Sequence, residues 1–284
     1  MSGGAVWLAP GQGMERVGMG LAVAAGCAEA ARLIDVASAA AGADLRRWLQ
    51  APGRDAERTE LAQPAWVAVA LGAAAALREA GFAPDIVAGH SLGELAAWSI
   101  AGGCAPEEAV RLAAARGRAM AAAARAAPGG MRAVAWEALE RVPPGLTLAV
   151  ENPDVAVLSG PTDALAQCPL GVRVPTGGPW HSPAMCAAEP AVRDALAAVP
   201  ARSLHTALIS HGPGAPVDDD GARAALAALS ARVRWREVLA RVVAAAPRVV
   251  VVLGPAKVLR HHLRLVTDAR VVGLERMEDL AAVG

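Results

Sequence analysis

One serine of this chain lies in a pattern that suits a catalytic nucleophile. Ser91 is the centre of the pentapeptide Gly-His-Ser-Leu-Gly at 89–93, between the short apolar run "DIVAG" and the helix-forming stretch "SLGELAAW". A sharp turn between a strand and a helix lifts a serine hydroxyl clear of a sheet, and the free N–H groups of that helix can stabilise an oxyanion. A serine that only caps the helix has the same neighbours, but the strand–turn–helix context favours the nucleophile.

A serine nucleophile needs a base, and the chain offers six histidines. His181 lies in the loop sequence "TGGPWHSPAM", where two glycines and a proline restrict the path of the backbone. His90 adjoins the serine, so we expect its side chain to point away from the attacking side of the hydroxyl. The other four have weaker claims: His205 and His211 flank a strand and a loop, and His261 and His262 are expected on the surface of a late helix. Spacing alone does not single out His181.

Composition and charge argue against several classes of function. Lys+Arg and Asp+Glu both number 27, and a net charge of zero argues against nucleic acid as the main partner. The start "MSGGAVWLAPGQGM" lacks the basic and apolar regions of a secretory signal, and the longest apolar run is too short to span a bilayer. Four scattered cysteines without a C-x-x-C pair fit core positions in a reducing cytoplasm. We therefore expect a cytoplasmic protein with no nucleic acid or membrane partner, and a monomer.

Strand and helix patterns alternate along most of the 284 residues. Short apolar strands are expected at 5–10, 85–89 and 248–254, and helices at 25–40, 64–80, 91–103 and 106–127. This alternation predicts an α/β fold with a parallel sheet covered by helices. Between about 130 and 195 short strands separated by Pro and Gly predict a small α+β insert. The large α/β subdomain would then comprise 1–129 and 196–284, and the small one 130–195.

Nine segments, in order, resemble one family: the malonyl-CoA:acyl carrier protein transacylases and the acyltransferase domains of polyketide synthases. The segments include "APGQGMERVGMG", "LAQPAW", "GHSLGELAAW", "AARGRAM", "ENPDVAVLSG" and "GPWHSPAM". Each one alone is modest, whereas nine in the same order are specific, and they run through nearly the whole chain. The resemblance implies an α/β-hydrolase-like large subdomain and a ferredoxin-like small one.

The resemblance also implies catalytic roles. Ser91 would be the nucleophile and His181 its general base, held by a backbone carbonyl near Ala228 in place of an aspartate. A carbonyl suffices for this, because it fixes the tautomer of the imidazole. The backbone N–H groups of Gln12 and Leu92 would form the oxyanion hole.

Further residues are implied to contact the substrate. Arg116 would pair with the free carboxylate of a malonyl group, since a guanidinium binds carboxylate bidentately and keeps its charge. An ordinary surface arginine is the alternative at this position. Gln63 would line the pocket, and His90 and Asn152 are weaker candidates near its mouth. Trp180 departs from the family, and its indole should crowd an α-methyl group and so favour malonyl.

The implied activity is a ping-pong transfer of a malonyl group from CoA to the phosphopantetheine thiol of an acyl carrier protein, in fatty-acid or polyketide synthesis. It requires no metal and no bound cofactor. The expected partners are acyl-CoA and the carrier protein, for which basic residues are the candidate docking sites: Arg46, Arg47, Arg260 and Arg264.

Two alternatives remain open. A hydrolase could use the same serine, with an acid from Asp218–Asp220 followed by His261 in the order of a hydrolase triad. A proofreading acyl hydrolase of the same family is the second form of this alternative. The other possibility is a binding module that retains the fold without catalysis.

Overall fold

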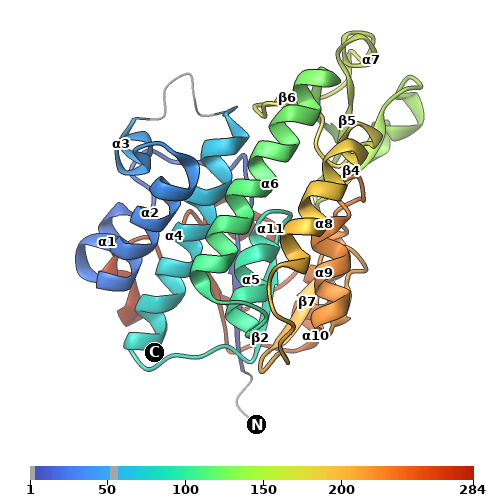
Figure 1. The fold of residues 1–284 in the computed structure, drawn as a ribbon. Coiled ribbons are helices and arrows are strands. Elements are labelled where there is room, and N and C mark those ends of the chain that lie inside the picture. The colour runs from blue at the N-terminus through green and yellow to red at the C-terminus, as the bar shows by residue number, and fades with distance from the viewer. Residues whose placement is uncertain (1–3, 52–56) are drawn as a thin grey trace.

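A six-stranded sheet forms the centre of the molecule (Figure 1). The computed structural model describes residues 4–51 and 57–284. Its strand order is β10-β9-β1-β2-β7-β8, in which the first five strands are parallel and β8 pairs antiparallel with β7. The bounds are β1 (Ala5–Ala9), β2 (Ile86–Gly89), β7 (Ala207–Ser210), β8 (Ala215–Val217), β9 (Val249–Val252) and β10 (Arg270–Gly273). The predicted α/β class with a parallel sheet is confirmed.

Apolar runs explain which strands are central. All four residues of β9 are valines, and all are buried. Strand β1 lies between β9 and β2, and its residues Val6 to Ala9 are buried too. Parallel strands buried on both faces show such continuous apolar sequences because helices cover both sides. Because β1 and β2 are parallel neighbours, their carboxyl ends lie at the same edge of the sheet. His90 and Ser91 directly follow β2 and therefore lie at this edge.

Helices connect the strands of this sheet. They are α1 (Leu21–Gly26), α2 (Ala28–Ala41), α3 (Leu45–Gln50), α4 (Thr59–Glu79), α5 (Gly93–Ala101), α6 (Pro106–Ala126), α8 (Glu189–Ala197), α9 (Asp219–Ala227), α10 (Trp235–Ala244) and α11 (Lys257–Arg264), with 3₁₀ turns η3 (Pro183–Ala188) and η4 (Met277–Ala282). The expected helix at 25–40 is two helices, because Cys27 has an extended backbone and caps α2 by accepting the N–H of Ala30.

Helix α4 differs from the prediction at its start. It begins at Thr59, five residues before the predicted start, so Pro64 lies inside the helix. The proline removes only one hydrogen bond, near the beginning of the helix. By length and composition α4 could cross a membrane, but 89% of its most apolar window is buried inside the fold. It is packed as a core helix, as its uninterrupted alanines and valines predict.

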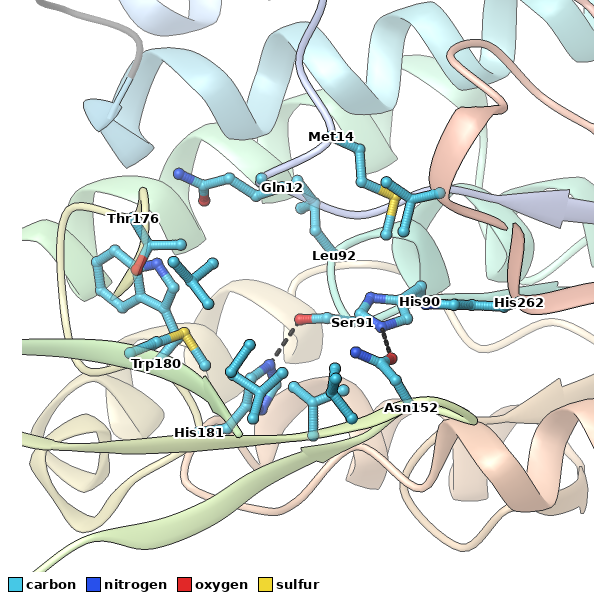
Figure 2. Close-up of a pocket in the computed structure, with 18 of the residues that line it drawn as sticks. Gln12, Met14, His90, Ser91, Leu92, Asn152, Thr176, Trp180, His181 and His262 are labelled. Carbon is cyan, nitrogen blue, oxygen red and sulfur yellow. Dashed lines mark hydrogen bonds between the residues drawn. The ribbon is translucent and has the colours of Figure 1, made fainter. Parts of the chain in front are cut away.

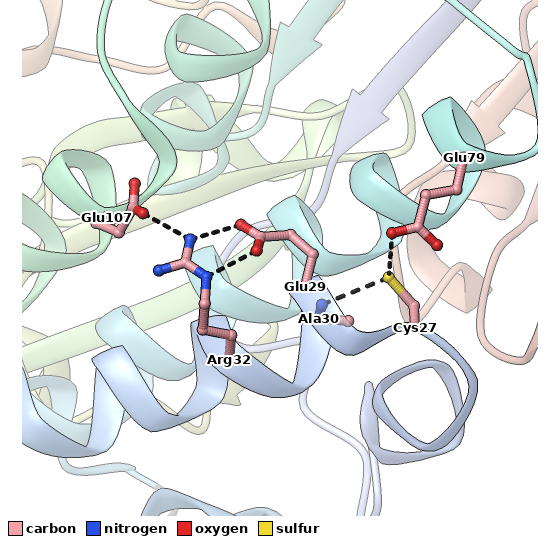
Figure 3. A network of polar contacts seen from close by, with 6 residues as sticks. All are labelled: Cys27, Glu29, Ala30, Arg32, Glu79 and Glu107. Carbon is pink, nitrogen blue, oxygen red and sulfur yellow. Dashed lines mark hydrogen bonds and ion pairs between the residues drawn. The ribbon is translucent and has the colours of Figure 1, made fainter.

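Ion pairs tie α2 to its neighbours (Figure 3). The guanidinium of Arg32 on α2 contacts the carboxylates of Glu29 on the same helix and Glu107 at the start of α6, each at 2.6 Å. The thiol of Cys27 lies 3.5 Å from a carboxylate oxygen of Glu79, at the end of α4. Because these groups are partly exposed, each ion pair contributes about 0–1 kcal/mol, and the apolar contacts beneath them hold the helices together.

The four cysteines form no disulfide, and Cys186 is exposed, unlike the core position expected for it.

A second sheet of four antiparallel strands begins where α6 ends. Its order is β4-β5-β3-β6, with β3 (Gly129–Ala135), β4 (Thr147–Glu151), β5 (Val155–Pro161) and β6 (Val172–Val174). The connections are the 3₁₀ turn η2 (Trp136–Arg141) and helix α7 (Thr162–Ala166). When the four strands β3 to β6 are numbered 1 to 4 and the order is read from β6, the sheet has the order 4-1-3-2, which is the expected ferredoxin-like arrangement. Figure 1 shows this sheet with α7 beside the end of α6, apart from the large sheet. The domain boundaries at 130 and 195 stay a prediction.

The two glycines of the Ser91 turn are required by close backbone contacts. A Cβ at Gly93 would lie 2.2 Å from the carbonyl oxygen of Ala9, and one at Gly89 would lie 2.1 Å from the N of Glu94. Either methyl group would separate α5 from the strands beneath it. The turn therefore depends on both glycines.

We predict that Gly93→Ala lowers the free energy of unfolding by about 2 kcal/mol or more, because the added methyl overpacks a backbone contact. Urea denaturation measures this. Gly130→Ala is the control, since its Cβ would meet only Leu165 Cδ1, at 3.4 Å, and we expect a change within about 0.5 kcal/mol. Equal stability of Gly93→Ala and the wild type would contradict the packing argument.

Candidate active site

Ser91 has the strained backbone of a nucleophile on a tight turn. It lies between β2 and α5, and its φ of 51° is in the left-handed region that non-glycine residues seldom adopt. This conformation is what directs the hydroxyl away from the sheet edge. In Figure 2 the hydroxyl of Ser91 points at His181.

His181 lies within hydrogen-bond distance of that hydroxyl. Its Nε2 is 2.6 Å from the Oγ of Ser91, although the two residues are 90 positions apart. Its φ of 57° is also left-handed, so the loop between β6 and η3 turns sharply at this residue. Of the six histidines, this is the one that the structure brings to the serine.

A backbone carbonyl fixes the tautomer of His181. The Nδ1 lies 2.8 Å from the carbonyl oxygen of Ala231. The backbone acceptor expected near Ala228 is thus the carbonyl of Ala231, three residues further along the chain, while the carbonyl of Ala228 itself accepts the N–H of Ala231 in the turn after α9. Because a carbonyl can only accept, Nδ1 carries the proton and Nε2 is left to accept the proton of Ser91. The arrangement is that of a general base.

Burial keeps the imidazole of His181 neutral. The residue is 4% exposed. Desolvation lowers the pKa of His181 to about 3, and the neighbouring His211 and Arg116 side chains act in the same direction. The side chain therefore remains in its proton-accepting form far below the usual titration range of histidine.

A cavity of about 400 Å³ opens over Ser91 and His181 (Figure 2). One wall comes from the small sheet and carries apolar side chains, among them Met131, Val150, Val157 and Val174. The opposite side is formed by the loop after β1 and the Ser91 turn, through Gln12 and Leu92. Both sheets are thus needed to enclose the serine.

Gln12 and Leu92, the two residues predicted to form the oxyanion hole, line the cavity beside Ser91. Leu92 directly precedes α5, and Gln12 belongs to the loop that packs on the serine turn. The approach is close, because a Cβ on Gly11 would lie 2.4 Å from the carbonyl oxygen of His90. Their role as N–H donors to an oxyanion stays a prediction.

Arg116 is the buried cation of the cavity. It comes from α6, is 6% exposed and donates from Nη1 to the Oε1 of Gln63 at 2.8 Å. The alternative of an ordinary surface arginine is wrong. Burial lowers the pKa of Arg116 to about 10, opposed by the carboxylate of Glu94, so the guanidinium stays charged at neutral pH. Gln63 does not line the cavity as expected: it is fully buried behind Arg116.

His90 and Asn152 form a second pair at the cavity. The Nε2 of His90 lies 3.2 Å from the Oδ1 of Asn152, and its ring packs edge-on against Trp235 at 5.0 Å between centroids. Desolvation lowers the pKa of His90 to about 3. This ring faces away from the Ser91 hydroxyl in Figure 2, as the sequence suggested. The pair joins the serine turn to the small sheet.

Trp180 forms part of the cavity wall next to His181. It is 5% exposed, and a Cβ on Gly178 would meet its ring at 2.6 Å. The indole is thus wedged between its own loop and the cavity. A bulky, buried ring at this place restricts the shape of any group bound to Ser91.

Two predictions about the late histidines are resolved by the structure. His262 is buried at 3% exposure and lines the cavity, so its expected surface position is wrong. The reason is that α11 is strongly two-sided, with Leu259, His262 and Leu263 on its inner face. His261 is exposed and contacts Asp154 at 3.2 Å. It does not meet Asp218–Asp220, so the hydrolase-type triad is not assembled.

Sequence reasoning missed a buried acid behind His181. Glu94 on α5 is fully buried and accepts hydrogen bonds from the Oγ of Ser210 at 2.6 Å and the N–H of His211 at 2.8 Å. The ring of His211 contacts the same carboxylate and lies edge-on to His181, with centroids 6.2 Å apart. The signal was an acid three residues after the serine, inside an otherwise apolar helix.

Among the described residues, no group of three or more His, Cys, Asp or Glu side chains could hold a metal ion.

Comparisons with known proteins agree on one family. Residues 6–264 match the family model described as "Acyl transferase domain". The chain is 34% identical over 195 residues to a malonyl CoA-acyl carrier protein transacylase of Mycolicibacterium smegmatis, covering 62% of this chain and 67% of that protein. It is 36% identical over 238 residues to a type I polyketide synthase of phenolphthiocerol synthesis from Mycobacterium marinum, covering 75% of this chain. The match spans only 11% of that synthase, so the chain corresponds to a small part of its length.

Solved structures agree over the whole fold. The chain matches the malonyl CoA-acyl carrier protein transacylase from Coxiella burnetii with a TM-score of 0.90 and 25% identity, covering 100% of this chain and 97% of that one. It matches MCAT from Mycobacterium tuberculosis with a TM-score of 0.88 and 31% identity, covering 98% and 99%.

A fluorophosphonate reacts with activated serines. We predict that its rate of reaction with Ser91 does not fall as the pH is lowered through about 6.5, the usual pKa of a histidine. The lowered pKa of His181, about 3, keeps the base neutral down to about pH 5. Intact-mass spectrometry between pH 5 and 8 measures the rate, with His181→Ala as the unreactive control. A half-loss of reactivity near pH 6.5 would contradict the buried, neutral imidazole.

Proposed function

The chain belongs to the acyl transferase domain family, and we propose that it moves a malonyl group from CoA to the thiol of a phosphopantetheinylated acyl carrier protein. One observation carries the proposal: the Ser91–His181 pair, 2.6 Å apart, shares a cavity with the buried cation of Arg116. Named relatives include malonyl CoA-acyl carrier protein transacylases and polyketide synthases. The product would serve fatty-acid or polyketide synthesis.

In the first half of the reaction, His181 Nε2 takes the proton of Ser91 as Oγ attacks the thioester carbonyl of malonyl-CoA. The C–S bond then breaks, the CoA thiolate leaves and His181 returns the proton to its sulfur, which gives malonyl-Ser91. The N–H groups of Leu92 and Gln12 would hold the oxyanion of the tetrahedral intermediate. A rigid serine turn limits the reorganisation that this step requires.

Arg116 would hold the carboxylate at the other end of the malonyl group. A buried guanidinium is costly unless an anion compensates it, and the substrate carboxylate provides that anion in addition to Glu94. Nη1 is occupied by Gln63, which leaves the other N–H groups for a bidentate contact. Pairing at this end fixes the position of the thioester at the other. The indole of Trp180 would disfavour an α-methyl group by about 1–3 kcal/mol.

In the second half, the thiol of the carrier protein attacks malonyl-Ser91. His181 accepts the thiol proton and returns it to Ser91 when the ester bond breaks, so the enzyme is regenerated. The reaction needs only these protein groups and the two substrates. Arg264 is exposed on α11, a helix that lines the cavity through other residues, and it fits a docking role better than Arg46, which is already paired with Asp35 at 2.8 Å. A cytoplasmic location and a monomeric state stay predictions.

We expect radioactive malonyl-CoA to label the wild type and to leave Ser91→Ala unlabelled, because the attacking oxygen is absent. Acid-stable counts after gel filtration measure the label. A labelled Ser91→Ala protein would refute the assignment of the nucleophile. Following the label with and without carrier protein separates transfer from hydrolysis: release as free malonate in the presence of carrier would support the acyl hydrolase instead.

Arg116→Ala should lower acylation by malonyl-CoA about 10- to 100-fold while leaving acetyl-CoA within a few fold, since only malonyl loses a charge-assisted contact of about 1.5–3 kcal/mol. A competition assay with both thioesters measures the ratio. Arg118→Ala is the matched control, because Arg118 is exposed on the same helix and donates to the backbone carbonyl of Ala40. An unchanged ratio in Arg116→Ala would remove the residue from substrate recognition.

A further inference from the structure

Three hydrogen bonds join Arg116 to the loop that carries Gln12. Arg116 on α6 donates to the Oε1 of Gln63 at 2.8 Å, and the Nε2 of Gln63 donates to the Oγ1 of Thr59 at 2.7 Å. Thr59 donates in turn to the Oε1 of Gln12 at 2.8 Å. The first three residues are 6%, 0% and 2% exposed. The series therefore runs almost entirely through the interior, behind the cavity wall.

The direction of every bond in the series is set by Arg116. A guanidinium has no acceptor, so the oxygen of Gln63 must face it and the amide nitrogen must face Thr59. The remaining hydrogen of that nitrogen points to the sulfur of Met120 at 3.2 Å. Thr59 then accepts from Gln63, and its single hydroxyl proton is left for Gln12. Bonds aligned in one direction polarise one another and strengthen the series.

The far end of the series is the loop proposed to hold the oxyanion. Figure 2 shows the amide of Gln12 turned away from the Ser91–His181 pair, so this side chain anchors the loop and does not act on the reacting atoms. A second bond ties the same loop to α4: Trp66 donates to Glu15 at 3.0 Å, and Glu15 also accepts the N–H of Gly13 at 2.9 Å. Only the Thr59 bond leads on to Arg116.

We propose that Thr59 is a positioning residue that couples the carboxylate clamp to the oxyanion loop, so that a substrate with a carboxylate is acylated faster. The inference rests on the proposed function of Arg116 and Gln12. A malonyl thioester must contact Arg116 at one end and the oxyanion loop at the other at the same time. Its rate of acylation therefore depends on the spacing between Arg116 and the loop. An acetyl thioester uses only the loop and is indifferent to that spacing.

The test compares Thr59→Val with Thr59→Ser. Valine has nearly the shape of threonine but removes the hydroxyl, whereas serine keeps it. Quenched-flow acylation of Ser91 by malonyl-CoA and by acetyl-CoA gives a rate ratio for each variant. Loss of a networked hydrogen bond corresponds to about 5- to 10-fold, so Thr59→Val should lower the malonyl-to-acetyl ratio by about that factor through the maximal rate. Thr59→Ser should retain the ratio of the wild type.

Two further single variants and one double variant keep the test decisive. Gln12→Met removes the acceptor at the half-buried end of the series and should lower the malonyl-to-acetyl ratio as Thr59→Val does. It provides the same test if Thr59→Val folds poorly. Trp66→Phe removes the bond to Glu15 but leaves the Thr59 bonds that set the spacing between the loop and Arg116, so it should slow both thioesters by the same factor. In an Arg116→Ala background Thr59→Val should leave the ratio unchanged, because the clamp is already gone.

The coupling is overturned if Thr59→Val or Gln12→Met slows malonyl and acetyl transfer by the same factor while Arg116→Ala still changes the ratio. That outcome would make Thr59 a structural residue only. It differs from failure of the proposed function itself, in which the wild type would show no preference for malonyl-CoA and Arg116→Ala would have no selective effect.

Discussion

The short contact between Ser91 and His181 is the constraint on which the rest of the structure depends. Both residues have a left-handed backbone, with φ of 51° and 57°, and such strain persists only where the surroundings impose it. The glycines at 89 and 93 allow β1, β2 and α5 to close around the serine. The small sheet and the loop after it bring the histidine, and the Ala231 carbonyl sets its proton. Two sheets are therefore needed to make one dyad.

Burial determines the charges of this site. It lowers the pKa values of His181 and His90 to about 3, which keeps both imidazoles neutral, whereas Arg116 stays cationic because its lowered pKa of about 10 is still above neutrality. The nearby carboxylate, Glu94, contacts His211 and not His181. The imidazole of His181 thus faces a backbone carbonyl and not a carboxylate. The resulting cavity combines one buried cation, Arg116, with largely apolar walls, which suits a short acyl chain that ends in an anion; the exposed side chains of Lys257 and Asp154 also line it.

Local chemistry was predictable from the sequence, and distant pairing was not. The Ser91 turn follows from five residues, and the α/β class from the alternation of strands and helices. Nothing in the spacing selects His181 over five other histidines, because a partner 90 residues away is fixed only by the path of the chain; resemblance to a family supplied it. The carbonyl of Ala231, the burial of His262 and the roles of Glu94 and Thr59 depend on packing between helices. For Ala231 and Thr59 no local motif marks the residue, whereas the lone acid of an apolar helix at Glu94 and the two-sided pattern of α11 around His262 are local signals that do not identify the partner.

The protonation of His181 in the resting protein tests the central claim most directly. Nitrogen-15 NMR of histidine-labelled protein, assigned with His181→Ala, distinguishes the two neutral tautomers and the imidazolium. The account predicts a proton on Nδ1 and none on Nε2, unchanged from pH 8 to pH 5. A proton on Nε2 at neutral pH, or conversion to the imidazolium near pH 6.5, would show that the histidine does not serve the serine as its base.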